Sequence, residues 1–321
     1  MPSKIVTYNI RQAQASDLAA MQDIAARTWG GDDYLPQVLD RWIDDPTGKL
    51  FAAVDKDIQI RGMARIVQLG EDEWWLEGVR VDPDDYVQGI GLVLLLYCIR
   101  EADKLGSGVL RMATVTNNIA IQDIAAKNDF TPVGSYALYR TDSANPQKAN
   151  EFRQLTPNDI PAIRAFLDQS PYYEWAAHSM ENAYQWRLIT DARLYTLTAD
   201  SLIYGWFPHT DKLEGIVIFN PLPNPAHGRV PILSIAYLDA TVGNLASLAL
   251  AVRGLLAEQG HRRARLCFVA RPERLVAMEQ AGWRWLKHIQ LDLFSRPIQR
   301  TTQALSLQNT VAHVKAKCKR G

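Results

Sequence analysis

Hydrophobic residues in the first half of the chain repeat with two different periods. Apolar side chains recur every three or four positions over residues 18–25, and residues 35–43 keep this spacing more regularly. This spacing predicts two amphipathic helices. Three segments rich in apolar residues follow, with a polar turn at residues 55–57, and predict an antiparallel meander of strands over residues 50–54, 58–69 and 73–81.

A strongly apolar helix and three further elements complete this half. Residues 92–105 are apolar on nearly every side in their first two turns, and Gly106 follows as a C-cap, which is typical of a buried helix. A strand, a helix and a last strand are predicted over residues 109–115, 119–127 and 133–140. With a short opening strand, the order is strand, two helices, three strands, helix, strand, helix, strand. This mixed α/β order excludes the strict alternation of a doubly wound sheet.

The start of the chain recurs in outline after its middle. In residues 10–18 and again in residues 152–160, a short strand runs into a helix cap. Ser16 or Asp17 is the candidate cap of the first helix, and the second start has Thr156 as cap, Pro157 at the first helical position and Asp159 as a first-turn acid. The repeat predicts a duplicated domain.

A polar, turn-rich stretch at residues 141–147 fits the join between the copies. We therefore predict a first domain over residues 1–142 and a second, degenerate copy over residues 150–296. Residues 297–321 lose strong periodicity and end in a short basic cluster without interleaved aromatic residues, which favours a solvated tail over an arm for nucleic acid.

Charge and composition restrict the class of function. The 321 residues include 35 Lys and Arg against 35 Asp and Glu, and 47% are hydrophobic. This composition is typical of a soluble globular protein, and the balanced charge provides no field to attract nucleic acid or an acidic membrane. No apolar run has the length of a signal peptide or a membrane span. We expect a cytoplasmic protein that binds a small molecule, and neither nucleic acid nor membrane.

The three cysteines, Cys98, Cys267 and Cys318, are far apart and have no partner at metal-ligand spacing. They predict buried or incidental thiols rather than a disulfide framework or a zinc site, so no metal is expected.

One segment has the features of a phosphate-binding loop. A strand ends at Pro83, a short loop turns, and Gly89 and Gly91 open the apolar helix. Backbone N–H groups and the dipole at a helix N-terminus attract anions, and glycines let a pyrophosphate approach closely. The same glycine spacing also occurs in ordinary tight turns, so this pattern alone leaves both interpretations open.

Because it follows a three-stranded meander, the loop resembles the Gln/Arg-x-x-Gly-x-Gly/Ala motif of the GNAT superfamily of N-acetyltransferases. The resemblance implies a tandem α/β GNAT fold, with a mixed central sheet flanked by helices in each domain, and acetyl-CoA as cosubstrate. In that family the strand before the loop splays from its neighbour, and its backbone pairs with the pantetheine arm. The implied cofactor contacts are Val79, Arg80, Val81, Val87, Gln88, Gly89, Ile90, Gly91, Leu92 and Asn118.

The segment departs from the family motif at several positions. Tyr86 stands where Gln or Arg is usual, and Val87 replaces a common Gly. Asp84 and Asp85 add negative charge near the expected phosphates.

A second resemblance concerns the acceptor. Residues 29–36, 41–46 and 77–83 look like the histidine N-acetyltransferase branch of the superfamily, whose members also carry a second, poorly matching domain. The similarity covers residues 20–140 well and the second half loosely. It implies acetyl transfer to the amino group of a small molecule, with a free amino acid such as histidine as one option.

Acetyl transfer needs a base for the amine, a donor for the thioester oxygen and a proton for the departing thiolate. Glu77, near the middle of its strand, is the candidate base, and the alternative is a structural pair with Arg80 or another strand side chain. A backbone N–H between Val79 and Val81 would polarise the carbonyl. Many of these enzymes have a tyrosine that acts as general acid on the helix after the fifth strand, but the matching position here is Ala125. Either the thiolate leaves unaided or another tyrosine substitutes, for which the candidates are Tyr34, Tyr136 and Tyr139.

Asp33 and Tyr34 lie at the turn between the first two helices, where the superfamily shapes its substrate site. Asp33 is a candidate for binding an ammonium group and Tyr34 for lining the pocket. The alternative for Asp33 is an N-cap of the helix that begins at Leu35.

In the second half, only Gly243 stands where two glycines are expected, so this copy is predicted to bind no CoA and to support the first. The proline-rich residues 221–225 are placed in a loop near the substrate cleft. Two other functions stay open. One is a non-catalytic, CoA-sensing or protein-interaction module built from two decayed GNAT folds, and the other is acetylation of a protein or an antibiotic.

Overall fold

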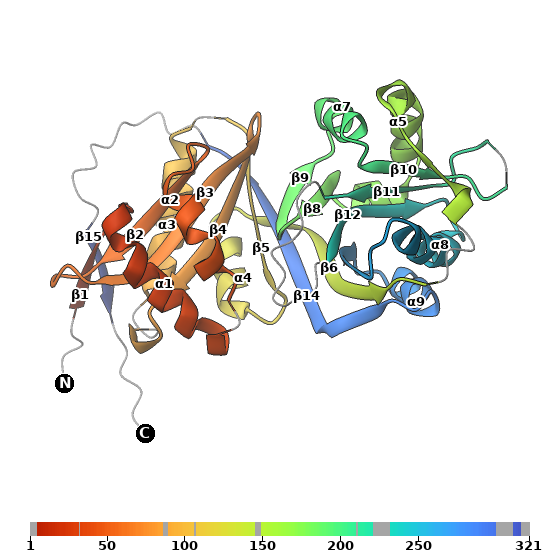
Figure 1. The fold of residues 1–321 in the computed structure, drawn as a ribbon. Coiled ribbons are helices and arrows are strands. Elements are labelled where there is room, and N and C mark those ends of the chain that lie inside the picture. Colours follow the sequence, from red (N-terminus) through yellow and green to blue (C-terminus); the bar gives the residue numbers. More distant parts are fainter. Residues whose placement is uncertain are drawn as a thin grey trace. The chain divides into compact units, whose positions relative to one another are not determined.

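The computed structural model describes residues 5–31, 33–85, 89–105, 107–144, 149–209, 211–220, 232–299 and 311–315. The chain forms two compact units (Figure 1). Unit 1 comprises Met1–Met112 and Ser295–Gly321, and unit 2 comprises Ala113–Phe294. The chain passes from one unit to the other within a strand both times, in β5 (Val109–Val115) and in β14 (Arg284–Pro297).

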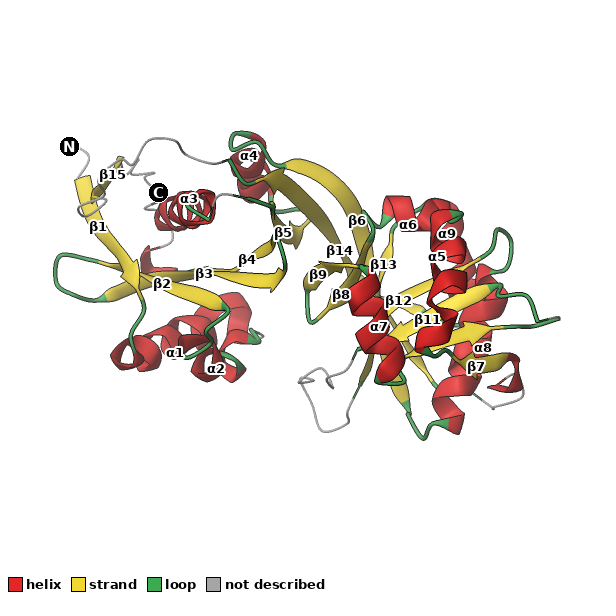
Figure 2. Cartoon of the chain, turned by 90° about the horizontal axis from the view of Figure 1, so that it is seen from above, coloured by secondary structure: helices red, strands yellow, loops and turns green. Residues whose placement is uncertain are grey.

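Unit 1 is a sheet covered by helices on both faces. Its other elements are β1 (Ile5–Gln12), α1 (Leu18–Arg27), α2 (Leu39–Ile43), β2 (Gly48–Val54), β3 (Ile60–Gly70), β4 (Glu73–Val81), α3 (Ile90–Asp103) and β15 (Val311–Lys315). The strand order is β15-β1-β2-β3-β4-β5, with β4 and β5 parallel and the other pairs antiparallel. Figure 2 shows α1 and α2 on one face of this sheet and α3 on the other.

The core of unit 1 contains the apolar positions that defined its elements. Met21 and Ile24 of α1 pack with Leu39, Leu50 and Met63, and all five side chains are buried. Burying an aliphatic side chain of this size stabilises the fold by about 1.5–3 kcal/mol. These contacts hold α1 and α2 against β2 and β3.

Two predicted helix bounds need correction. The helix expected over residues 35–43 consists of a 3₁₀ turn, Leu35–Gln37, followed by the short α2, because Val38 leaves helical geometry with φ −121°. Leu35 and Leu39 are nevertheless buried, as the spacing predicts. Helix α3 begins at Ile90, two residues before the predicted start at Leu92, and Gly106 lies outside the described residues.

Unit 2 has the same kind of mixed sheet. Its elements besides β14 are α4 (Ile119–Ala126), β6 (Thr131–Asp142), β7 (Phe152–Gln154), α5 (Ile160–Asp168), α6 (Pro171–Trp175), β8 (Ser179–Asn182), β9 (Gln185–Leu188), α7 (Asp191–Ala199), β10 (Ile203–Trp206), β11 (Gly215–Phe219), β12 (Leu233–Ala240), α8 (Leu245–Glu258), β13 (Arg263–Val269) and α9 (Pro272–Gln280). The strand order is β14-β6-β13-β12-β11-β10-β7, and β8 and β9 form a separate hairpin. Helix α8 packs on β11 and β12.

The last strand of the first predicted copy lies in the other compact unit, unit 2, and the last strand of the second predicted copy ends in unit 1. Strand β6, which ends the predicted first domain, pairs antiparallel with β13 from Tyr136–Val269 to Asp142–Arg263 within unit 2. In unit 1, where the end of β14 lies, the N–H of Ile298 donates to the carbonyl of Gly108 at 2.8 Å. The boundaries of the compact units therefore differ from the domain boundaries that the repeat predicts. As the bounds of a duplicated sequence, residues 1–142 and 150–296 stay a prediction.

The two predicted helix starts share one set of contacts. Arg11 binds the carboxylate of Asp17 at 2.6 and 2.8 Å, and Arg153 binds that of Asp159 at 3.2 and 3.0 Å. Thr156 caps the second start in a capping box with Asp159, as predicted. The first start differs in detail: Asp17 holds the N-cap position of α1 without a side-chain capping bond, whereas the N-cap of the preceding 3₁₀ turn is Gln14, whose N–H donates to Asp17 at 2.8 Å.

The predicted solvated tail also needs correction. Its residues Val311–Lys315 form β15, which pairs antiparallel with β1 from Ile5–Lys315 to Asn9–Val311. The backbone of an edge strand offers unpaired N–H and C=O groups to any extended segment, so a strand can form here without a strong hydrophobic repeat. The predicted linker at residues 145–147 and the proline-rich residues 221–225 lie outside the described residues.

Candidate active site

Strand β4 is paired along one side and only partly along the other. Its register with β3 runs from Glu73–Gly70 to Val81–Gly62. Its parallel register with β5 spans only Glu73–Val109 to Trp75–Arg111. The register between β4 and β5 thus ends at Trp75, although β4 itself continues to Val81. This is the splay that the family resemblance implies.

A bulge interrupts β4 where the splay begins. The register with β3 shifts between Met63 and Arg65, and Gly78 has a φ of +67°. A Cβ at Gly78 would lie 2.7 Å from the ring of Trp42, so both the backbone conformation and the space require glycine. Bulges of this kind redirect backbone groups, and they are frequent beside active sites.

The backbone beyond the bulge has a defined direction. The N–H of Asp82 donates to the carbonyl of Arg61 at 2.9 Å and therefore faces β3. Consecutive residues of a strand turn their N–H groups to opposite sides, so the N–H of Val81 faces the open side of β4. The carbonyl of Val79 accepts a bond from Arg80 Nη1 at 3.0 Å.

The N-terminus of α3 follows this strand directly. Gly89 is the N-cap in left-handed conformation, with φ +73°. A Cβ at Gly91 would lie 3.4 Å from Val81, so the first turn of α3 packs on the end of β4. Its first N–H groups have no acceptor within the helix. Of the predicted loop contacts, Ile90 is buried and Leu92 is exposed, while Val87 and Gln88, like Tyr86, lie outside the described residues.

The acidic residues before the loop are neutralised by arginines. Arg27 pairs with Asp82 at 3.1 Å and with Asp84 at 3.3 Å. Arg61 pairs with Asp82 and Asp85, both at 3.2 Å. Although burial opposes it, hydrogen bonds from the Asp84 N–H and from these arginines hold the pKa of Asp82 below its usual value. The negative charge near the loop is therefore smaller than the sequence indicates.

Glu77 has a specific partner. Its carboxylate accepts a hydrogen bond from Arg65 Nη1 at 2.6 Å, and both side chains are buried. Arg65 also binds Asp45 and stacks on Trp42, with 4.6 Å between the guanidinium carbon and the ring centroid. The pairing that we set against a catalytic role for Glu77 thus exists, with Arg65 of the neighbouring strand rather than with Arg80.

Asp33 is committed to a structural pair. Both of its oxygens accept from Arg80, at 2.7 Å from Nε and 3.0 Å from Nη2, and Oδ1 also accepts from the N–H of Leu35 at 3.2 Å. The carboxylate has 0% exposure. This arrangement favours a structural role for Asp33, because both oxygens of the buried carboxylate are occupied, and its predicted contact with the substrate ammonium stays a prediction. The carboxylate does accept from the first N–H of the turn at Leu35, as the capping alternative requires, although the N-cap position itself is Tyr34.

Tyr34 lies in the same cluster. Its ring meets Trp42 edge to face at a centroid distance of 6.3 Å, and the Arg80 guanidinium is 5.9 Å from the Tyr34 centroid. The other two candidate acids, Tyr136 and Tyr139, belong to unit 2, where the Tyr136 hydroxyl donates to the carbonyl of Ala176 and burial raises the pKa of Tyr139 to about 12. Of the three tyrosines, Tyr34 is the one that contacts Arg80, and it also contacts Trp42, on which the partner of Glu77, Arg65, stacks.

Asn118 belongs to unit 2 and caps α4. Its Oδ1 accepts from the N–H of Ile121 at 3.5 Å, and its Nδ2 donates to Thr114 Oγ1 at 3.1 Å. Its predicted contact with the cofactor stays a prediction.

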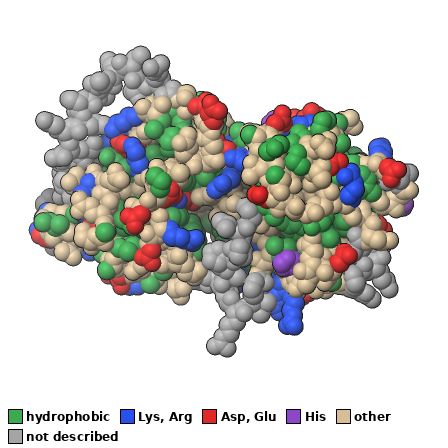
Figure 3. Space-filling model, turned by 45° about the horizontal axis from the view of Figure 1, so that its top comes forward, with side chains coloured by type: hydrophobic (Ala, Val, Ile, Leu, Met, Phe, Trp, Pro, Cys, Tyr) green, Lys and Arg blue, Asp and Glu red, His purple; other side chains and the backbone are tan. Residues whose placement is uncertain are grey.

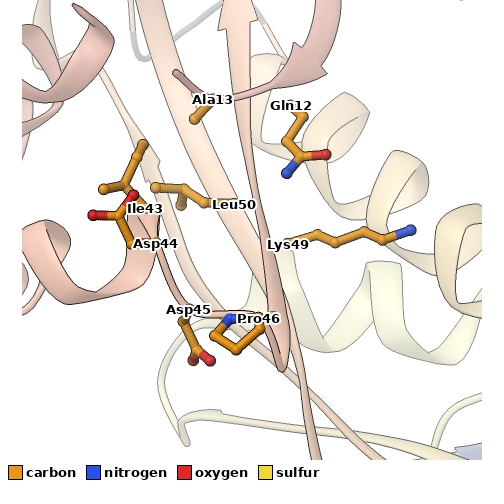
Figure 4. A pocket seen from close by; sticks show the side chains of 9 residues that line it. Gln12, Ala13, Ile43, Asp44, Asp45, Pro46, Lys49 and Leu50 are labelled. Carbon is orange, nitrogen blue, oxygen red and sulfur yellow. The ribbon is translucent and has the colours of Figure 1, made fainter. Parts of the chain in front are cut away.

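A hollow of about 330 Å³ lies beside the cluster that Arg65 forms with Asp45, Glu77 and Trp42 (Figure 4). The end of β1, the end of α2 and the start of β2 surround it, with Ile43, Asp44 and Asp45 on one side. Asp45 connects this hollow to Arg65 and so to Glu77.

Sequence reasoning missed the role of Arg65. A signal was present, since an arginine in the middle of a strand of apolar residues must find a partner when the strand is buried. Neither that partner nor the stacking on Trp42 follows from the spacing, because they come from different elements.

The corresponding region of unit 2 also has a splay. The parallel register of β12 with β13 spans Leu233–Ala264 to Ile235–Leu266 and ends there, although both strands continue. At the start of α8, Asn244 donates to Glu214 Oε2 at 2.9 Å, which places a carboxylate where a phosphate would need positive charge.

Side chains of unit 2 fill the space beside this second splay. Arg274 donates to Asp239 at 3.2 Å, and its guanidinium carbon lies 3.7 Å from the Tyr172 centroid and 4.7 Å from that of Phe268. Ser170 also donates to Asp239. All of these side chains except Ser170 are buried, and burial raises the pKa of Asp239.

Three further observations concern metal ions, membranes and surface charge. Among the described residues, no group of three or more His, Cys, Asp or Glu side chains is placed to hold a metal ion. None of the described helices has both the length and the apolar composition needed to cross a membrane. Basic and acidic side chains are interspersed on the face seen in Figure 3.

Comparison with known proteins identifies the type of domain. Residues 18–130 match the model of the acetyltransferase (GNAT) family. A GCN5-related N-acetyltransferase from Sphaerobacter thermophilus has a TM-score of 0.60 at 14% identity, over 91% of this chain and 96% of that one. A tandem GNAT protein from the clavulanic acid biosynthesis pathway has a TM-score of 0.54 at 11% identity, over 92% and 99% of the two chains. No curated protein sequence matches the chain. These similarities confirm the predicted tandem α/β fold.

Proposed function

We propose that this chain, whose first domain belongs to the GNAT acetyltransferase family, transfers the acetyl group of acetyl-CoA to the amino group of a small molecule. A free amino acid such as histidine is the acceptor class that we favour.

The observation that carries the proposal is the open side of β4 next to the N-terminus of α3. The N–H of Val81 faces that side, and the register of β4 with β5 ends at Trp75, well before Val81. The pantetheine amides of acetyl-CoA would pair with this backbone, as a further strand would. The pyrophosphate would bind the first N–H groups of α3, next to Gly89 and Gly91.

The residues of the cluster supply the remaining chemistry. The neutral amine attacks the thioester carbon, a C–N bond forms and the C–S bond breaks. The proton of the amine passes to Glu77, directly or through a water, and Tyr34 gives a proton to the departing sulfur. A backbone N–H at the bulge beyond Gly78 stabilises the charge that develops on the carbonyl oxygen.

Two observations support a single cofactor site and a reducing compartment. The splay of unit 2 contains Arg274 and Asp239, and a carboxylate stands at the start of α8, so we propose that this copy binds no acetyl-CoA. Cys98 and Cys267 are free, buried thiols, in keeping with the cytoplasm that we propose as its location.

The direct test follows release of the CoA thiol from acetyl-CoA in the presence of free amino acids, histidine included, and of polyamines. We expect release that depends on one acceptor class and is lost in Glu77→Gln and in Gly89→Glu. Glu77→Gln removes the base but leaves the cofactor site, so acetyl-CoA binding by calorimetry should persist in it. Gly89→Glu should abolish binding, because it places a side chain and a negative charge at a left-handed N-cap.

Absence of turnover in the wild type would count against the enzyme. If acetyl-CoA still binds, the chain is a CoA-sensing module. If it does not bind, the chain is an interaction module.

A further inference from the structure

One arginine in unit 1 connects the proposed base, Glu77, to the turn after α2. Arg65 lies on β3 opposite Glu77, and its guanidinium binds the Glu77 and Asp45 carboxylates together. The Arg65 side chain is 3% exposed and stacks on Trp42. Residues of four different elements therefore contact this guanidinium. They belong to β4, the turn after α2, α2 itself and β2.

Gly48 at the start of β2 supplies the fourth contact. A Cβ at Gly48 would lie 2.8 Å from both Nε and Nη2 of Arg65. The backbone of β2 thus packs directly on the guanidinium, and Nε has no hydrogen-bond partner on this side among the described residues. The site has room for the guanidinium only because residue 48 lacks a side chain.

The other charged groups near Glu77 are already paired. Asp45 accepts from the N–H and hydroxyl of Thr47 at 2.9 and 2.7 Å as well as from Arg65. Asp33 and Arg80 neutralise each other beyond Trp42 and Tyr34. Arg65 faces the Glu77 carboxylate at hydrogen-bond distance, 2.6 Å.

We propose that Arg65 is a positioning residue for acetyl transfer: it holds the carboxylate of Glu77 ionised and oriented toward the acceptor amine. This inference rests on the proposed function, in which Glu77 is the base. Arg65 touches neither substrate, and its effect reaches the reaction only through Glu77. Asp45 binds the other end of the guanidinium.

The test compares the pH dependence of kcat/KM for the acceptor in the wild type, Arg65→Met, Arg65→Lys and Arg296→Met. Arg296 is a matched control, because its side chain is also 3% exposed and pairs with Asp103 in unit 1, at 3.1 Å. In Arg65→Met we expect kcat to fall by about 10-fold or more, within the range of a lost general base. The acid limb of the pH profile, where Glu77 becomes protonated, should move to higher pH by about one unit or more. The variant lacks the nearby positive charge that favours the ionised carboxylate.

The other variants separate positioning from folding. Arg65→Lys keeps the charge but not the fork geometry, so we expect it to restore the acid limb and only part of kcat. Arg296→Met should lower stability and leave the acid limb in place. KM for acetyl-CoA should not change in either Arg65 variant.

Gly48→Ala provides a variant that removes no charge. Its methyl group displaces the guanidinium, so we expect a smaller fall in kcat of the same kind. If Arg65→Met does not fold, this variant and Arg65→Lys carry the test.

The double variant Arg65→Met, Glu77→Gln decides whether Arg65 acts through Glu77. We expect it to be no slower than Glu77→Gln alone. A further fall equal to that of Arg65→Met in the wild type, or an acid limb that does not move in Arg65→Met, would overturn the inference. These failures differ from failure of the proposed function, in which the wild type shows no turnover or Glu77→Gln keeps the full rate.

Discussion

Asp33→Asn separates a structural role of Asp33 from the role in substrate binding that the sequence also allowed. The substitution keeps the shape of the side chain and removes its charge. It leaves the Arg80 guanidinium buried opposite a neutral amide. The structure therefore predicts a loss of stability and no direct effect on binding of the amine.

The magnitude follows from the contacts. Asp33 has 0% side-chain exposure and accepts bonds of 2.7, 3.0 and 3.2 Å from Arg80 and Leu35. Removing one member of a buried ion pair costs about 3–5 kcal/mol. Asparagine keeps one acceptor oxygen, so we expect a loss near the lower end, about 3 kcal/mol of the unfolding free energy. A domain of typical stability, about 5–15 kcal/mol, would remain folded at 25 °C.

The assay is urea-induced unfolding followed by tryptophan fluorescence, combined with hydrogen exchange. Because the chain has two compact units, their transitions need not coincide, and exchange should assign the loss to α1 and β4 of unit 1. Asp23→Asn is the control. Asp23 makes an exposed pair with Arg27, with side-chain exposures of 63% and 37%, and its loss should change stability by no more than about 0.5 kcal/mol.

One result would refute this reasoning. If Asp33→Asn leaves the unfolding free energy unchanged and raises KM for the acceptor amine, then Asp33 contacts the substrate, and the pair with Arg80 does not hold the turn.

Three further outcomes follow from the same structure. Hydrogen bonding to Arg11 lowers the pKa of Asp17 against the effect of burial. The ionised carboxylate therefore stabilises the fold fully above the unfolded-state pKa of about 4, and this stabilisation is lost as the pH falls through the lower folded-state pKa. In urea unfolding, Asp17→Asn should be less stable than the wild type at pH 7 and equal to it at strongly acidic pH, with a smaller effect for the more exposed Asp159. Gly91→Ala should leave the protein as stable or up to about 1 kcal/mol more stable, because a methyl group 3.4 Å from Val81 makes an ordinary contact in a helix. It should nevertheless weaken the binding of acetyl-CoA measured by calorimetry. Unchanged affinity would speak against the proposed pyrophosphate site at the N-terminus of α3. The same calorimetry on the wild type should give one acetyl-CoA per chain, and two would show that the second splay is open.

Much of the local structure of both units could be predicted from local pattern. The strand at Val109–Val115 and the helix that starts at Ile119 agree with the predicted bounds, and the second helix start is capped by Thr156 as expected. Helix periodicity, strand alternation and caps depend on residues within a few positions of one another, so a single sequence contains the information they need. The glycines of the loop belong to this class as well, since Gly89 adopts a conformation that few other residues tolerate.

The partners of the charged residues were decided by the tertiary structure. Glu77 meets Arg65 because the β3–β4 register places them opposite each other, just before the bulge at Gly78. Asp33 meets Arg80 across 47 positions of sequence. Each pairing depends on a register or on helix packing that sums many weak contacts, so the residue types alone left several partners open.

The assembly of the two copies shows the same limit at a larger scale. The sequence by itself determined that the fold is duplicated, that the first copy has a glycine loop at a helix N-terminus and that the second lacks it. Only the tertiary structure decided that β6 pairs with β13 and that Arg274 and Asp239 come together beside the second splay. Strand neighbours and buried ion pairs depend on which distant surfaces exclude water together, and no short-range repeat in the chain records that choice.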